Sequence, residues 1–187
     1  MVIEKLRAGT RQTHEDLEKE MLPFIKGATN ADEYARLLHL FYGYYHPLEQ
    51  GISRYLDESI LPDIADRRKA GWILNDLRAM NRSDEILEDS NAPLIQSRAD
   101  ALGAMYVMEG SSLGGKVISK MIADNLNYPD HSALSFFYGY GGQTGVRWKE
   151  FLAVLDRFSG TVEEDLIVKK ANEVFLKFQQ WLQRNMS

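Results

Sequence analysis

Four polar residues near the N-terminus are spaced so that one face of a helix would carry them all. Arg7, Arg11, His14 and Glu18 stand at positions i, i+4, i+7 and i+11. Residues three and four apart stack on the same helix face, so this spacing aligns two permanent cations, an imidazole and a carboxylate. Such a row is poor core material. It suits an anionic ligand whose centre takes a nitrogen donor, with Glu18 holding the other ring nitrogen of His14.

Haem is a ligand with these properties. Its iron accepts an imidazole nitrogen, and its propionates form charge-assisted pairs with arginine side chains. A single histidine on an amphipathic helix is more often structural or solvated, which is the alternative for His14. The remaining histidines, His39, His46 and His131, have no carboxylate placed to make them a catalytic base, and we expect them to be structural.

A second segment, residues 101–118, combines a helical pattern with several glycines. Gly103, Gly110 and Gly114 stand at i, i+7 and i+11, again on one helix face. Each glycine inside a helix costs about 0.5–1 kcal/mol relative to alanine, so this arrangement needs a reason. Either another helix packs against the bare backbone, or a flat ligand does. The hydroxyl of Ser111 is a candidate to contact a polar ligand atom or an ordered water.

Hydrophobic periodicity and proline positions predict the elements that hold these residues. Pro47 should kink the second helix, and Asn30 should cap its start. The glycine-rich aromatic segment 136–142 is predicted to be a loop. The sequence therefore indicates an all-α fold, one domain over 1–187, with helices at 2–22, 31–60, 64–80, 94–126, 144–158 and 162–184.

Two clusters of similar residues have simpler explanations than a site. The aromatic run 41–45 is expected to lie in the core rather than to form a cofactor box. The basic run 67–69 is expected on a solvated helix face, where it would also be able to meet an acidic electron donor.

Composition excludes several classes of protein. The chain has 187 residues, 44% of them hydrophobic, and a net charge of −5, which argues against generic nucleic-acid binding. It contains no cysteine, so disulfides, a thiolate nucleophile and cysteine-ligated metals are excluded. We find neither a signal-peptide pattern nor an apolar run of membrane-spanning length. We therefore expect a cytoplasmic protein with no membrane partner, and a monomer by default.

Together, the two polar segments resemble the haem oxygenase family, most closely its short bacterial, biliverdin-producing members. The segment from Leu6 to Glu18 is similar to the family's proximal helix, and the glycine pair at Gly110 and Gly114 is similar to its distal helix. Residues 133–151 resemble the late loop of the family and the helix that follows it. The resemblance implies a multi-helix bundle with haem between the first helix and a kinked, glycine-rich distal helix.

The resemblance also implies a role for each matching residue. His14 becomes the iron ligand and Glu18 its orienting partner. Tyr106 becomes a pocket residue at the haem edge. The candidates for propionate contact are Arg7, Arg11 and Lys149, and the positions at the oxygen-binding face are Gly110, Gly114 and Ser111.

The activity implied is cleavage of haem by O2 to biliverdin, ferrous iron and carbon monoxide, with electrons from a ferredoxin or a flavoprotein reductase. Ser111 departs from the family pattern, because many members carry an aspartate there that organises waters for proton delivery. Serine holds a water but is not an acid. The alternative is therefore a haem carrier or sensor of the same fold that has lost turnover.

Rival helical proteins lack the residues they would need. A ferritin-like di-iron oxidase requires Glu-x-x-His pairs, which this sequence does not contain. A thiaminase of related fold relies on a cysteine, and there is none. The remaining alternative is a helical interaction scaffold without a cofactor.

Overall fold

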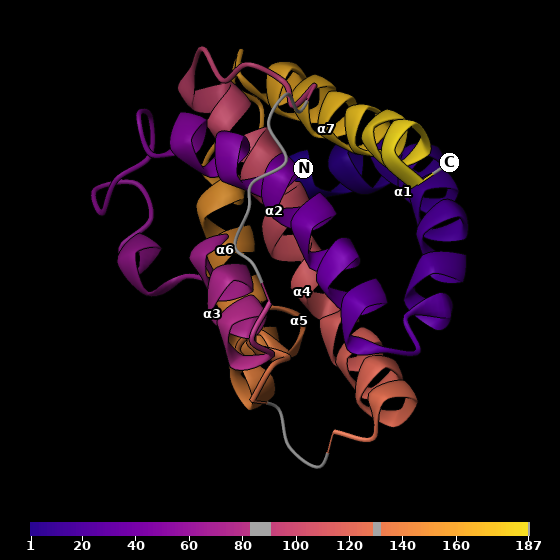
Figure 1. Ribbon diagram of the computed structural model, residues 1–187. Helices are drawn as coiled ribbons and strands as arrows, with labels where there is room; N and C mark the ends of the chain where they lie inside the picture. The colour runs from indigo at the N-terminus through magenta and orange to yellow at the C-terminus, as the bar shows by residue number, and fades with distance from the viewer. Residues whose placement is uncertain (83–90, 129–131, 187) are drawn as a thin grey trace.

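The computed structural model describes residues 1–82, 91–128 and 132–186, and all regular secondary structure within these ranges is helical (Figure 1). This confirms the all-α prediction. The helices are α1 Val2–Gly27, α2 Ala31–Ile52, α3 Gly71–Ala79, α4 Arg98–Leu126, α5 Ser135–Tyr138, α6 Thr144–Asp156 and α7 Glu164–Met186, with 3-10 turns η1 Ile64–Asp66 and η2 Gly141–Gln143.

Helix α4 is the central element of the bundle. It packs against α1, α2, α5, α6 and α7, and α7 also lies along α1 (Figure 1). At Gly103 an added Cβ would lie 2.5 Å from the carbonyl oxygen of Ile167 on α7. No side chain fits into that space. At this position the glycine therefore permits α4 and α7 to pack closely, as expected if another helix lies against the bare backbone.

Aromatic residues of α2 form the core contact with α7, as the sequence predicted for the run 41–45. The rings of Tyr44 and Phe178 stack with centroids 4.5 Å apart, and the hydroxyl of Tyr44 donates to the carbonyl of Val174 at 2.7 Å. The indole N–H of Trp181 donates to the carbonyl of Leu40 at 3.0 Å. Buried aromatic pairs of this kind add about 0.5–1.5 kcal/mol beyond their area burial.

Three predicted helix ends are wrong, and the first is the start of α4, which lies at Arg98 after the Ser97 cap rather than at residue 94. α1 continues through Pro23 to Gly27, because its last turn buries Ile25 in the core and this burial offsets one lost hydrogen bond. α2 passes through Pro47, begins at the predicted Asn30 cap and ends at Ile52 rather than residue 60. Beyond it, the carboxylate of Asp57 accepts a hydrogen bond from the backbone N–H of Ser59 at 2.9 Å, a local turn that competes with the helix.

The predicted helix 64–80 is also wrong, because it is interrupted between η1 and α3. Arg67 has extended backbone angles there, φ −77° and ψ 155°. Arg67 and Arg68 are only 2% and 8% exposed, so the expectation of a solvated basic face is wrong for both. A continuous helix would present neighbouring residues about 100° apart, and the break allows both guanidinium groups to enter the interior.

The prediction of a loop at 136–142 is only partly right, because the segment overlaps the single-turn helix α5 and then η2. Gly139 has φ +58° at the end of α5, a left-handed conformation that favours glycine.

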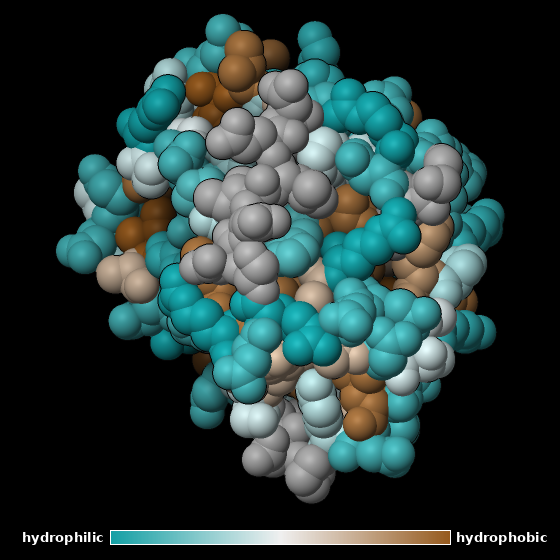
Figure 2. Space-filling model, in the orientation of Figure 1, coloured by the Kyte–Doolittle hydropathy of each residue, from teal (hydrophilic) through white to brown (hydrophobic). Residues whose placement is uncertain are grey.

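On the face of the molecule shown in Figure 2, hydrophilic residues predominate and hydrophobic ones form small, scattered groups. Within the described residues, no helix has the length and apolar character needed to cross a membrane.

Candidate functional site

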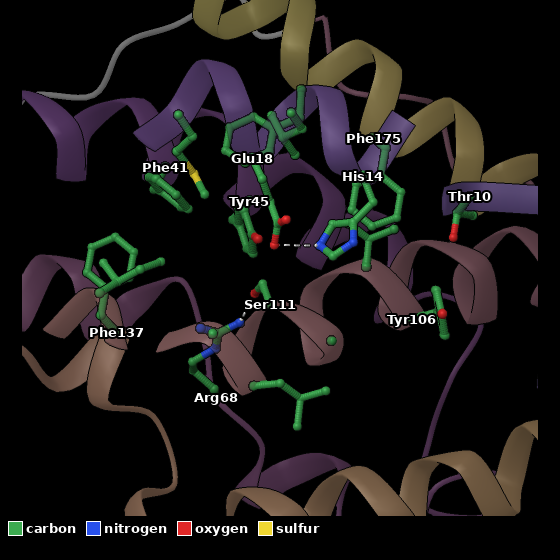
Figure 3. Close-up of a pocket in the computed structure, with 18 of the residues that line it drawn as sticks. Thr10, His14, Glu18, Phe41, Tyr45, Arg68, Tyr106, Ser111, Phe137 and Phe175 are labelled. Carbon is green, nitrogen blue, oxygen red and sulfur yellow. Dashed lines mark hydrogen bonds and ion pairs between the residues drawn. The ribbon is translucent and has the colours of Figure 1, made fainter. Parts of the chain in front are cut away.

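A cavity of about 410 Å³ lies between α1 and α4, and its volume is in the range usual for small-molecule sites (Figure 3). Its lining is mostly apolar and aromatic, with a few polar side chains. The α1 wall contributes Thr10, His14, Leu17, Glu18 and Met21. The α4 wall contributes Tyr106, Val107, Gly110, Ser111, Leu113, Gly114 and Ile118. Aromatic residues of α2, α5, α6 and α7 close the remaining sides.

His14 and Glu18 form a pair on the α1 wall. Nε2 of His14 lies 3.3 Å from Oε1 of Glu18, and their side chains are 50% and 60% exposed. The imidazole ring lies beside Phe175, with ring centroids 5.0 Å apart. A carboxylate that holds one ring nitrogen as a donor leaves the lone pair of the other nitrogen for a metal ion. Nε2 faces the carboxylate of Glu18, and an orienting role of Glu18 toward a metal ligand stays a prediction.

The ligand set around His14 limits which metal fits. Among the described residues, no group of three or more histidine, cysteine, aspartate or glutamate side chains is arranged to hold a metal ion. A lone imidazole beside an apolar cavity suits a metal that arrives with most of its ligands already in place. Haem iron, held by porphyrin nitrogens, is such a metal.

Among the side chains of the α4 wall, Gly110 and Gly114 leave two stretches of bare backbone at the cavity. An added Cβ at Gly114 would meet none of the described atoms within 4 Å, and one at Gly110 would come no closer than 3.6 Å to Trp148. At Gly115 an added Cβ would collide with the carbonyl oxygen of Phe137. Gly103 and Gly115 therefore serve packing, whereas Gly110 and Gly114 border the cavity, where contact with a flat ligand stays a prediction.

Arg68 is a cavity residue that the sequence analysis missed. Its Nη2 donates to the hydroxyl of Ser111 at 2.5 Å and to the carbonyl of Met108, and its Nη1 donates to the carbonyl of Phe136 at 3.3 Å (Figure 3). The guanidinium carbon lies 4.5 Å from the centre of the Phe136 ring. Burial raises the pKa of the Tyr45 hydroxyl on the same wall, while Arg68 and Ser111 partly offset that effect.

A buried ion cluster lies behind this wall. Arg67 donates to Glu109 at 2.7 Å and to Asp63 at 3.0 Å. The hydroxyl of Tyr140 donates to Glu109 at 2.9 Å and accepts the backbone N–H of Arg68 at 2.7 Å. Burial, followed by the negative charge of Glu109, raises the pKa of Tyr140 well above its ordinary value. Glu109 thus faces away from the cavity, as the helical spacing from Gly110 predicts.

The remaining predicted residues differ in how close they come to the cavity. Tyr106 lines it, with its ring 5.5 Å from that of Trp148, and burial raises its pKa while Thr10 and Arg7 oppose this. Arg7 is exposed nearby. Lys149 is exposed on α6, next to the lining residue Trp148.

Arg11, predicted to contact a propionate, is paired with another residue in the structure. Its Nε donates to Glu15 at 2.9 Å on the surface of α1. Arg7, Arg11 and Lys149 do not line the cavity, so their contact with propionates stays a prediction. His131 lies outside the described residues.

Comparison with known sequences identifies the family. The sequence model described as "Heme oxygenase" matches residues 1–184. Heme oxygenase PigA of Pseudomonas aeruginosa is 27% identical over 188 residues, covering 98% of this chain and 92% of that protein. A heme oxygenase of Xanthomonas campestris pv. campestris is 26% identical over 132 residues, covering 71% of this chain and 77% of that protein.

Solved structures show the same fold. Heme oxygenase from Neisseria meningitidis, solved with NO and CO bound, matches with a TM-score of 0.83 at 18% identity, covering 99% of this chain and 92% of that one. Heme oxygenase-1 from Synechocystis sp. PCC6803, in complex with heme, matches with 0.74 at 18% identity, covering 98% and 91%. Since the family model spans nearly the whole sequence, the chain belongs to the haem oxygenase family of enzymes.

Proposed function

We propose that the protein binds haem in the cavity between α1 and α4 and cleaves it with dioxygen to biliverdin, ferrous iron and carbon monoxide. The electrons are supplied by a separate ferredoxin or flavoprotein reductase. One observation carries this proposal: a half-exposed imidazole, His14, borders the same cavity as a glycine backbone surface on α4.

The cavity has walls suited to a flat, mostly apolar molecule with charged ends. Phe41, Phe137 and Phe178 provide apolar contact, and Gly114 leaves room against α4. Exposed cations lie near the Tyr106 and Trp148 end of the cavity, where we place the propionates. This orientation keeps the carboxylates hydrated and the ring buried, which is the less costly arrangement for charged groups.

His14 suits ring oxidation because an imidazole donates less electron density to iron than a thiolate does. A thiolate ligand favours splitting of the O–O bond. The glycine backbone of α4 keeps the cavity narrow on the side away from His14. The residue after Gly110 on that wall is Ser111, whose side chain is not an acid. With haem bound, Gly110 and Gly114 would keep the space beside the ring narrow, and the haem iron would supply the oxygen chemistry.

Ser111 also favours a second function, because a serine delivers protons less well than the aspartate found in many relatives. A haem carrier or sensor would keep the pocket and lack turnover. The cytoplasmic location, the monomeric state and the identity of the electron donor stay predictions.

One experiment separates these functions. The purified protein is mixed with hemin, and then ascorbate or a ferredoxin system is added in air. We expect a Soret band that gives way to a biliverdin spectrum. A Soret band that persists would indicate a haem carrier or sensor. If no Soret band forms at all, a helical scaffold without a cofactor would remain.

The ligand role of His14 is tested by His14→Ala, with His39→Ala as the control outside the cavity. Loss of the coordinated-haem spectrum in His14→Ala alone supports the assignment. Unchanged coordination in that variant refutes it.

A further inference from the structure

Arg68 is a buried cation without a carboxylate partner among the described residues. Its guanidinium contacts two backbone carbonyls, one hydroxyl and one aromatic face. The preceding residue, Arg67, is also buried but is paired with both Glu109 and Asp63. Two adjacent arginines therefore enter the same interior, and within the part of the chain that the structure describes only Arg67 has carboxylate partners.

An unbalanced buried charge is costly, because neutral donors and acceptors replace only part of the lost hydration. The field of Arg68 therefore acts on the cavity that it lines. A small anion placed there would supply the missing charge.

We propose that Arg68 is the anion-stabilising residue on the oxygen side of bound haem, acting with Ser111 in place of an acidic side chain. This inference rests on the proposed function. The guanidinium donates hydrogen bonds to an iron ligand that carries or gains negative charge, which includes azide, hydroxide and oxygen as it is reduced. Arg68 is not the proton donor, and protons reach the site through water.

Several contacts place Arg68 for this role. Ser111 on α4 holds the side chain, and Figure 3 shows the pair across the cavity from His14 and Glu18. Tyr140 accepts the backbone N–H of Arg68 and is itself fixed by its hydrogen bond to Glu109. Tyr140 is thus a positioning residue, and its effect should have the same sign as that of Arg68 and be smaller.

The test is azide binding to the ferric haem complex of the full chain. Arg68→Gln removes the charge, Arg68→Lys keeps it, and Arg36→Gln is the control at an exposed arginine on α2. We expect Arg68→Gln to bind azide about tenfold more weakly, the order expected for one partly screened charge at close range. Arg68→Lys should recover most of the affinity, and Arg36→Gln should match the wild type.

A neutral ligand separates charge from altered cavity shape. Carbon monoxide affinity of the ferrous complex should change little in Arg68→Gln, whereas the C–O stretching frequency should rise because a nearby cation lowers it. The Tyr140→Phe variant should shift azide affinity less than Arg68→Gln and in the same direction. A residue that is only structural is not expected to weaken azide binding and raise the C–O frequency while carbon monoxide affinity stays unchanged.

Equal azide affinity in wild type and Arg68→Gln, with intact Soret bands, would overturn the inference and leave the proposed function standing. Wild-type protein that takes up no hemin would overturn both. If Arg68→Gln does not fold, a crystal structure of the wild-type azide complex decides the question. Azide beyond hydrogen-bonding reach of the guanidinium contradicts the proposal, and contact with it supports the proposal.

Discussion

The two walls of the cavity are built in different ways. On α1, His14 and Glu18 are half-exposed and contact each other one helical turn apart. On α4, the side chain of Ser111 is held by Arg68, which arrives from the segment between η1 and α3. The α1 wall is therefore a local arrangement within one helix, and the α4 wall depends on tertiary contacts between distant parts of the chain.

This difference separates function from stability. An exposed pair such as His14 and Glu18 contributes little to folding, because water screens it. The cluster behind α4 is buried, so removing one member leaves another charge without a partner. Mutations on the α1 wall should change haem affinity with little effect on the free energy of unfolding. Mutations behind α4 should lower the free energy of unfolding with little effect on haem affinity.

The largest expected effect comes from Glu109→Ala. It leaves the buried guanidinium of Arg67 without one of its two carboxylates, and breaking a buried pair from one side costs about 3–5 kcal/mol. Urea unfolding measures the loss. Glu18→Ala is the control on the other wall and should unfold close to the wild type. Similar losses in the two variants would contradict the distinction between the walls.

Two neighbouring glycines provide a sharper comparison within α4. Gly115→Ala would force a Cβ against the carbonyl oxygen of Phe137, and overpacking of this kind costs about 1–3 kcal/mol. Gly114→Ala has free space and should stabilise the helix by about 0.5–1 kcal/mol, while placing a methyl group in the cavity. Urea unfolding measures the change in stability of each variant, and hemin titration measures its haem affinity.

Only Gly114→Ala is expected to combine higher stability with weaker hemin binding. If Gly115→Ala weakened hemin binding while stability stayed unchanged, the assignment of the two glycines to packing and to the cavity would be reversed.

Helical spacing was enough to place His14 and Glu18 on one wall and Gly110 and Gly114 on the other, but Arg7, Arg11 and Gly103, predicted on the same faces, do not line the cavity. Each pair lies within one helix, so the relative directions of their side chains follow from 3.6 residues per turn. The sequence also predicted most helices and the buried position of the aromatic run, but not that Phe41 and Tyr45 of this run line the cavity. The family match then confirmed the fold and the enzyme family.

Arg68 was missed because nothing near it in the sequence marks it as buried. The basic run 67–69 has the pattern of a surface, and the partner of Arg67, Glu109, is 42 positions away. The break before α3 that turns both arginines inward is stabilised by these same long-range contacts. Local periodicity carries no information about them.

A smaller effect is predicted for the pH dependence of stability. The raised pKa keeps folded Tyr140 neutral at pH values where the unfolded chain has begun to lose that proton. Its contribution is therefore complete below pH 10.0, the ordinary value, and is lost as the pH rises toward the folded value. Between the unfolded and the folded pKa, each such tyrosine lowers the free energy of unfolding by up to about 1.4 kcal/mol per pH unit.

Tyr140→Phe should make the decline of the unfolding free energy above pH 10.0 shallower by that amount. Tyr55→Phe, at an exposed position, is the control and should parallel the wild type. Other buried tyrosines contribute equally to each protein, so the difference isolates Tyr140. Parallel curves for Tyr140→Phe and wild type would mean that its hydroxyl is not shielded behind α4.

The smallest effect on stability is expected at the rim of the α1 wall. Arg11 and Glu15 form an exposed pair at 2.9 Å, and Lys120 and Asp124 form a similar pair at 2.9 Å on α4. Arg11→Gln and Lys120→Gln should each change urea unfolding too little to resolve, because exposed pairs of this type are weak. If Arg11 leaves Glu15 to meet a propionate, only Arg11→Gln will weaken hemin binding, severalfold and less so at high salt. Equal hemin affinity in the two variants would remove Arg11 from the site and leave Arg7 and Lys149 as the propionate contacts to be tested in the same way.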